Sequence, residues 1–101
     1  MYVIDPERID LAREFKGCIY GRHSGELQRV VNRMRGGANA GRYVIVCTKR
    51  HREWTLARMG ERPGDPLVPV PGYVFHSGEE AEWTVFKLRW RELTGRDLPI
   101  E

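Results

Sequence analysis

Two short runs in the middle of the chain show the side-chain alternation of β-strands. In residues 43–47 both alternating sets are apolar, which predicts a central strand covered on both faces. In residues 54–57, Trp54 and Leu56 share one face and Thr55 lies opposite them. Only a short cationic stretch separates the two runs, so we expect them to pair as an antiparallel hairpin in the middle of the fold.

A helix is predicted near the N-terminus. Asp5, Pro6 and Glu7 are typical of a helix start, because Asp accepts hydrogen bonds from free amides, Pro suits the first turn and Glu complements the positive end of the helix dipole. The helix should run to about Phe15, with Gly17 just beyond its end. Its apolar stripe is thin, and a loosely docked terminal arm is the alternative.

A second helix should begin after Ser24, which can cap its first turn. Apolar residues recur there at the i, i+3, i+4 and i+7 positions of one helix face: Leu27, Val30, Val31 and Met34. Gly36 and Gly37 are expected to end this helix. Because it has a single apolar face, it should cover one side of the sheet. The stretch before it, residues 17–21, is either a connector or an edge strand.

Four prolines mark the segment that follows the hairpin, residues 60–72. Proline fixes φ and has no amide hydrogen, so this segment should be a stiff, extended surface loop rather than a helix or a central strand. Such loops are uncommon in small domains unless they brace the fold or contact a partner, and both roles stay open here. Residues 73–75 then predict a third strand, which continues a meander.

The last helix is predicted to begin at a capping box formed by Ser77 and Glu80 and to end at about Leu93, with Gly95 as its stop. It has two apolar arcs on nearly opposite sides. The first arc consists of Ala81, Val85 and Leu88, and the second of Trp83, Phe86, Trp90 and Leu93.

The second arc of this helix raises a question of packing. A three-stranded sheet and two other helices have little left to cover it, and three half-exposed aromatic side chains would leave an apolar patch of about 300 Å². We therefore favour an exposed arc that forms an interface. The alternative is that the N-terminal helix packs Leu11 and Phe15 over Trp83 and Trp90 and closes the core.

Together these elements predict one small α+β domain that spans residues 1–101. A three-stranded antiparallel meander should be covered by two to three helices, in the order α-α-β-β-β-α, and a length of 101 residues fits one domain. No run is long enough for a membrane span and no signal peptide is recognisable, so we expect a cytoplasmic protein without membrane contact. Cys18 and Cys47 should be free thiols, with Cys47 in the core.

The net charge of +3 at pH 7 permits an acidic partner without requiring one. Basic residues recur on the second helix and in the hairpin turn: Arg29, Arg33, Lys49, Arg50 and Arg52. If the two groups converged, they could follow a phosphate backbone, which makes a small nucleic-acid-binding module the alternative function. Acidic residues are spread through the same sequence, so a solvated helix face and a charged turn are favoured.

No residue pattern in the sequence predicts catalysis or a metal site. The three histidines, His23, His51 and His76, lack the spacing of metal ligands. Neither Ser24 nor Ser77 lies in a Gly-x-Ser-x-Gly elbow. Three carboxylates lie near the hairpin exit and the proline-rich segment: Glu53, Glu61 and Asp65. Their spacing is not specific, so they are best interpreted as surface charge, and we predict no catalytic residue and no metal ligand.

Several short motifs, in order along the chain, are similar to one known family. They are Leu27-Gln28-Arg29-Val30 with Asn32, Gly41-Arg42-Tyr43, Arg52-Glu53-Trp54, Ala57-Arg58-Met59-Gly60-Glu61 with Pro63, and Phe75 followed by Glu79-Glu80-Ala81, Val85-Phe86 and Arg89. In this order and spacing, over roughly residues 20–92, they resemble the small subunit of N,N-dimethylformamidase. The chain departs from that pattern in a shorter N-terminal extension and a longer loop at residues 63–71, which leaves the amide substrate open.

That family is a two-subunit amide hydrolase, and the resemblance implies a division of labour. Catalysis, with its bound iron, would belong to a large subunit, and the small subunit would be a stabilising, non-catalytic chain of a hetero-oligomer. We expect this chain to contact such a partner through the second arc of its last helix and the proline-rich loop. The candidate contacts are Trp83, Phe86, Trp90, Leu93, Leu67, Val68 and Val70.

Overall fold

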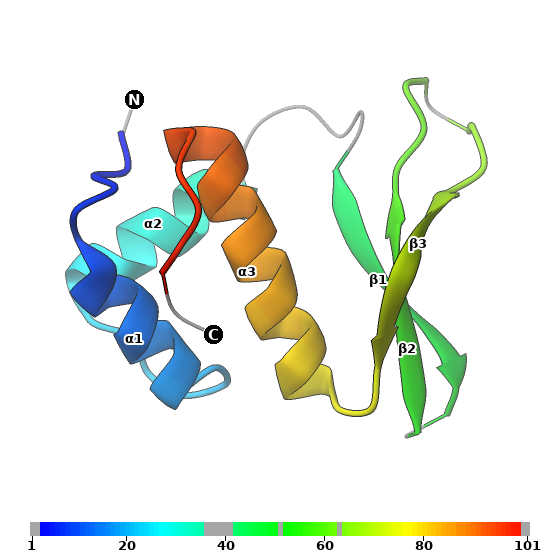
Figure 1. Ribbon diagram of the computed structural model, residues 1–101, viewed down its shortest axis with the longest axis horizontal. Helices are drawn as coiled ribbons and strands as arrows, with labels where there is room; N and C mark the ends of the chain where they lie inside the picture. The colour runs from blue at the N-terminus through cyan, green and yellow to red at the C-terminus, as the bar shows by residue number, and fades with distance from the viewer. Residues whose placement is uncertain (1–2, 36–41, 51, 63, 100–101) are drawn as a thin grey trace. The chain divides into compact units, whose positions relative to one another are not determined.

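The computed structural model describes residues 3–35, 42–50, 52–62 and 64–99. Its elements follow in the order α-α-β-β-β-α, as predicted, and form an α+β fold (Figure 1). They group into two compact units, each described by itself below. The helical unit comprises Met1–Gly37 and Trp83–Glu101, and the sheet unit comprises Ala38–Glu82.

Helix α1, Ile9–Gly17, begins later than the sequence suggested. Asp5 Oδ1 accepts a hydrogen bond from the Glu7 N–H at 2.9 Å, and the Asp5 carbonyl accepts one from the Arg8 N–H at 3.1 Å. These bonds close a separate turn, so the predicted cap organises the approach to the helix rather than its first residue. The helix also continues past Phe15, and Gly17 is its last residue.

Helix α2, Gly25–Arg35, begins where predicted, because Ser24 Oγ accepts a hydrogen bond from the Leu27 N–H at 3.3 Å. Its four predicted apolar residues are all buried. They belong to the core of the helical unit, where their cluster contains residues of α1 and of the last helix. The expectation that this face covers a sheet is therefore wrong. The predicted stop at Gly36 and Gly37 lies outside the described residues.

The residues between the two helices form a connector rather than an edge strand. Among them, Cys18 is exposed, and its carbonyl lies 2.9 Å from Nε2 of His23. The core of the helical unit contains side chains from both of these helices and from the last helix. It consists of Ile4, Leu11, Ala12, Phe15, Leu27, Val30, Val31, Met34, Trp83, Phe86, Trp90 and Leu98.

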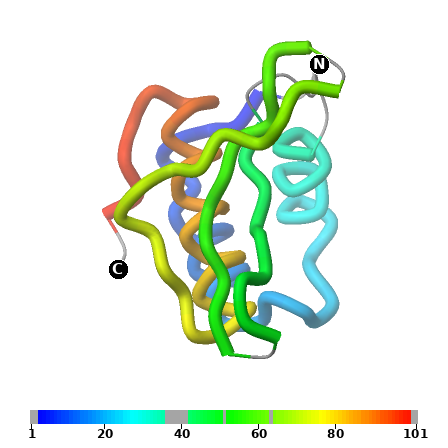
Figure 2. The backbone as a smooth tube through the Cα atoms, turned by 90° about the vertical axis from the view of Figure 1, so that its right-hand side faces the viewer, coloured from blue at the N-terminus to red at the C-terminus, as the bar shows by residue number. Residues whose placement is uncertain are grey.

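The sheet unit contains three antiparallel strands: β1, Tyr43–Lys49; β2, Glu53–Arg58; and β3, Val68–Phe75. Their spatial order is β1-β2-β3, so the predicted hairpin and meander are confirmed (Figure 2). The central strand is β2, however, and β1 lies at the edge. The prediction of a doubly covered first strand is wrong, because apolar residues on both faces of β1 are only half-buried. Cys47 is exposed, not in the core, for the same reason.

Strand β3 extends into the proline-rich segment that was predicted as a loop. Pro69 pairs with Ala57, and Val74 pairs with Thr55, so four residues of β3 lie opposite the single residue Leu56. Gly72 has φ +89° within this irregular stretch, a conformation that residues with a Cβ rarely adopt. Prolines are tolerated here because β3 is an edge strand, whose outward N–H groups need no partner in the sheet.

Helix α3, Gly78–Thr94, has the predicted ends. Ser77 Oγ accepts a hydrogen bond from the Glu80 N–H at 3.1 Å, and the Glu80 carboxylate reaches back to the His76 N–H at 3.2 Å. Gly95, with φ +76°, follows the last turn and donates its N–H to the Arg91 carbonyl. None of the helices in the described ranges has the length and apolarity that a bilayer crossing requires.

Candidate partner interface

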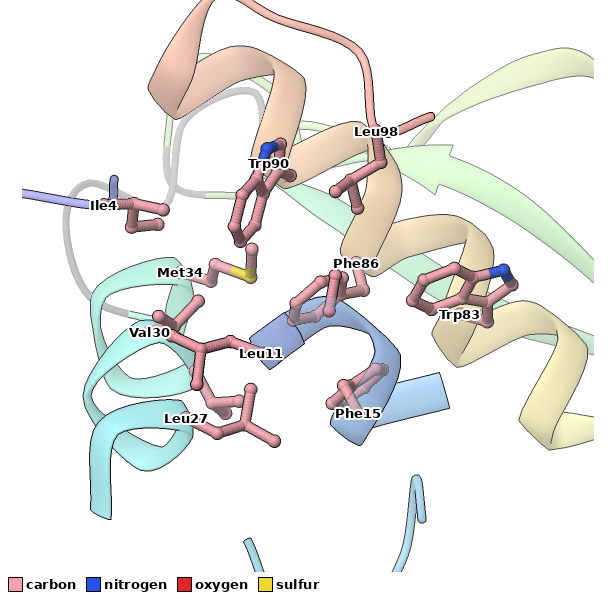
Figure 3. Packing of buried hydrophobic residues seen from close by; sticks show 12 residues of the cluster. Ile4, Leu11, Phe15, Leu27, Val30, Met34, Trp83, Phe86, Trp90 and Leu98 are labelled. Carbon is pink, nitrogen blue, oxygen red and sulfur yellow. The ribbon is translucent and has the colours of Figure 1, made fainter. Parts of the chain in front are cut away.

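The second aromatic arc of α3 lies in the core of the helical unit. Trp83, Phe86 and Trp90 are only 7%, 3% and 1% exposed. The prediction that this arc is open to solvent is therefore wrong for these three residues. The alternative packing is the observed one, because Leu11 and Phe15 of α1 belong to the same cluster (Figure 3).

Stacked rings hold α1 against α3 in this core. The Phe15 ring lies 4.2 Å from the Phe86 ring and 6.3 Å from the Trp83 ring, centroid to centroid, and both pairs are stacked. Phe86 also lies 6.0 Å from Trp90 in a tilted arrangement. Such pairs contribute roughly 0.5–1.5 kcal/mol each beyond the area that they bury. Phe15 of α1 thus stacks on two residues of the arc that was expected to need a partner.

Trp83 has the most polar surroundings of these aromatic residues. The ammonium groups of Lys16 and Lys87 each lie 5.6 Å from its ring centroid, within the range of cation–π attraction. Its indole nitrogen points away from Phe15 and Phe86 (Figure 3) and finds no acceptor among the described residues. Among the described residues, the contacts of Trp83 are therefore made by its ring, and its N–H makes no hydrogen bond.

The remaining predicted contact residues are open to solvent to different degrees. Leu67 and Val68 are 47% and 57% exposed at the start of β3, and Val70 is half-buried. Leu93, near the end of α3, is 37% exposed. Val74, which was not among the predicted contact residues, is 50% exposed on β3. Its alternation with buried Phe75 is the pattern that could have revealed it.

The predicted basic residues belong to two different units. Arg29 and Arg33 lie on α2 in the helical unit, where Arg29 is exposed and Arg33 is half-buried. Lys49, Arg50 and Arg52 are exposed at the β1–β2 turn of the sheet unit. The Arg52 N–H donates to the Lys49 carbonyl at 2.9 Å, which closes this turn.

A charged hollow of ≈ 580 Å³ lies between α1 and the start of α2. Arg8 bridges its two sides, with Nε 3.0 Å from Asp10 and Nη2 2.5 Å from Glu26. The hydrogen bond from Arg8 lowers the pKa of Asp10, and the hydrogen bonds to Asp10 and Glu26 raise the pKa of Arg8. The charges that line the hollow are therefore paired with one another. Through Arg8 these ion pairs link α1 to α2, and we call them the ion-pair clamp.

Glu14 completes this clamp from α1. Its carboxylate accepts hydrogen bonds at 2.7 Å from both the N–H and the hydroxyl of Ser24. The backbone bond, followed by the hydroxyl bond, lowers the pKa of Glu14. Ser24 Oγ is also the cap of α2, so one carboxylate on α1 orients the residue that begins the next helix.

Glu53, Asp65 and the two serines that were weighed as catalytic candidates have structural partners, and the third carboxylate, Glu61, is exposed. Glu53 accepts a hydrogen bond from Thr48 Oγ1 at 2.9 Å, and Asp65 accepts one from the Arg62 N–H at 3.2 Å. Ser24 and Ser77 cap helices, as described above. Within the described ranges, no three His, Cys, Asp or Glu side chains come together as metal ligands. His51 lies outside those ranges.

A comparison with protein families finds a match over nearly the whole chain. Residues 3–98 match the model of the N,N-dimethylformamidase alpha subunit. The matched range includes all six helices and strands described above. No curated protein matches the sequence. The resemblance inferred from the ordered motifs is confirmed by the family match: the chain belongs to the N,N-dimethylformamidase alpha-subunit family.

Proposed function

We propose that this chain is the non-catalytic small subunit of a heteromeric amidohydrolase similar to N,N-dimethylformamidase. Its role is to stabilise a large, iron-dependent subunit that hydrolyses formamide-type C–N bonds. The observation that carries the proposal is the family match over residues 3–98. A subunit family implies a multi-subunit enzyme, in which a small chain supplies surface rather than a reaction centre.

The iron belongs to the large subunit in this proposal. Iron needs several His or carboxylate ligands around one point. The described part of this chain offers no group of three such side chains, and the histidines at 23 and 76 lie in separate units. The residues that the structure describes therefore do not fit the metal.

The contact residues that we assign to the partner are fewer than the sequence suggested. Trp83, Phe86 and Trp90 are buried within the chain, so we no longer assign them to the contact with the partner. They belong to the core that α3 shares with α1 and α2. The exposed apolar candidates are Leu67 and Val68 at the start of β3 and Leu93 on α3. Exposed aliphatic side chains of this kind gain free energy when a partner removes them from water.

Co-expression with the large subunit of the same organism tests the proposal. We expect a co-purifying complex with amide hydrolase activity and no activity from the small chain alone. Leu67→Asp combined with Val68→Asp should weaken the complex, because charged groups would be buried at the contact. Val3→Asp is the matched control, since Val3 is 80% exposed and is not a candidate contact. A small chain that never co-purifies with the large subunit would contradict the proposal.

A further inference from the structure

The two edges of the sheet differ in their capacity to accept another strand. Strand β3 carries Pro69 and Pro71, which have no amide hydrogen to donate across the edge. Strand β1 has the sequence Tyr-Val-Ile-Val-Cys-Thr-Lys and no proline. Prolines on an edge strand prevent pairing with a further strand, and an apolar edge without them is a template for it. Of the two edges, only β1 offers continuous backbone groups.

A hydrogen bond at the end of the hairpin far from its turn identifies which groups of β1 face outward. The Met59 N–H donates to the Arg42 carbonyl at 2.8 Å, so Arg42 directs its carbonyl at the β2 side. Along an antiparallel ladder, residue pairs that exchange hydrogen bonds alternate with pairs that do not. The register is regular from Tyr43 to Cys47. Val44 and Val46 therefore bond to β2. Ile45 and Cys47 direct their N–H and C=O groups away from it, to the side on which no strand of the described residues pairs with β1.

We propose that this edge of β1 accepts an extended segment of the partner subunit as a fourth strand. The inference rests on the proposed function, because it names how the large subunit is held. Residues 43–47 span about 17 Å, enough to pair with a five-residue segment. Such strand addition draws its affinity from main-chain hydrogen bonds and its specificity from alternate side chains. Half-buried apolar residues on both faces of β1 provide the side-chain contacts.

Charge determines which strand fits. Lys49, Arg50 and Arg52 are exposed at one end of β1, and Arg42 lies at the other. Glu53, the acidic residue nearest the turn, holds Thr48. A segment with an apolar centre and acidic residues beside the β1–β2 turn is therefore attracted at that end. A second copy of this chain is not, since an antiparallel pairing of two β1 strands that joins Ile45 to Cys47 places Arg42 opposite Arg50, and like charges placed opposite each other are unfavourable.

Amide hydrogen exchange of the small chain, alone and in the co-purified complex, tests this inference directly. In the free chain the Ile45 and Cys47 amides should exchange faster than the Val44 and Val46 amides, which bond to β2. In the complex, exchange at Ile45 and Cys47 should slow by roughly tenfold or more, as expected when each amide gains a hydrogen bond. A complex that forms without this protection overturns the inference and leaves the proposed function intact.

A matched pair of variants distinguishes the contribution of the β1 backbone to binding from that of the side chain. Ile45→Pro removes the outward N–H while the bonds to β2 stay, and Ile45→Ala removes most of the side chain but keeps the N–H. We expect Ile45→Pro to raise the dissociation constant of the complex roughly tenfold and Ile45→Ala to raise it much less. Thermal unfolding of each free variant verifies that the sheet still forms. Cys47→Pro and Cys47→Ala repeat the comparison where a side chain is already exposed.

Other outcomes overturn the inference in distinguishable ways. Equal losses from the proline and alanine variants would show that the edge backbone is not used. A free chain that dimerises, with Ile45 and Cys47 already protected, would assign this edge to a second copy. Failure of any complex to form would reject both this inference and the proposed function.

Discussion

At the scale of single residues, Phe15 packs the first helix against the last one. Its ring stacks on Phe86 and Trp83 of the aromatic arc of α3, the packing that the sequence offered only as the alternative to an exposed arc. Trp90, 1% exposed, lies in the same cluster, and Leu93 lies three residues further along the helix but is 37% exposed. Residues of one predicted arc therefore have different roles, because the width of the covered stripe depends on the helix packed against it.

Trp90→Ala should destabilise the isolated chain by about 3–5 kcal/mol, the usual cost of removing a large buried aromatic side chain. Leu93→Ala on the same helix is the control and should change the free energy of unfolding by about 0.5 kcal/mol or less. Urea denaturation of both variants measures the difference. Equal effects would contradict the burial described for Trp90.

Glu14 should make stability depend on acid pH. Its pKa is lowered in the folded chain, so the stabilisation is fully present above its unfolded pKa and is lost as pH falls through the folded value. Glu14→Gln should therefore flatten the loss of stability in the acid range more than Glu61→Gln, which changes the net charge equally. Thermal unfolding between neutral pH and about pH 3 measures both slopes. The same slope in both variants would contradict the assignment.

At the scale of elements, β3 shows how an edge strand accommodates residues that a central strand excludes. Pro69 pairs with Ala57, and Gly72 occupies the left-handed region inside the irregular stretch. The space around Gly72 is open, because no atom lies within 4 Å of an added Cβ. A substitution there is therefore limited by backbone conformation rather than by a steric clash.

Gly72→Ala should destabilise the chain by about 1–2 kcal/mol, the cost of a left-handed conformation for a residue with a Cβ. Gly72→Asn is the matched comparison and should cost less, since asparagine tolerates that region. Chemical denaturation measures the two changes. If alanine were as well tolerated as asparagine, positive φ at this position would not be a constraint.

At the scale of the whole molecule, the match to a subunit family suggests a multi-subunit enzyme. The proposed role is stabilisation of a large subunit, and this has a thermodynamic consequence. A partner that binds only the folded large subunit stabilises it in proportion to the logarithm of its concentration over the dissociation constant.

With the small chain present at about 100 times the dissociation constant, the large subunit should gain about 2.7 kcal/mol of stability. Thermal unfolding of the large subunit across a titration measures this gain. The Leu67→Asp, Val68→Asp double variant at the same concentration should give a smaller gain. A large subunit whose unfolding is unaffected by the small chain would argue against the stabilising role.

Much of this fold could be predicted locally. Helix caps at Ser24 and Ser77, the stop at Gly95 and the apolar face of α2 depend on residues within one or two turns of each other. The hairpin likewise depends on alternation and a short connection. The exposed candidates Leu67 and Leu93 were also recognisable. The open edge of β1 was not, because apolar residues on both faces are typical of a central strand.

The sequence by itself therefore determined the order and type of the elements, most of their ends, and the family to which the chain belongs. Only the tertiary structure decided that β2 is central, that β1 is an edge, and that Phe15 covers Phe86. The physical reason is that periodicity shows which faces of an element avoid water. It does not show which distant segment covers each face, since that depends on packing between residues far apart in the chain.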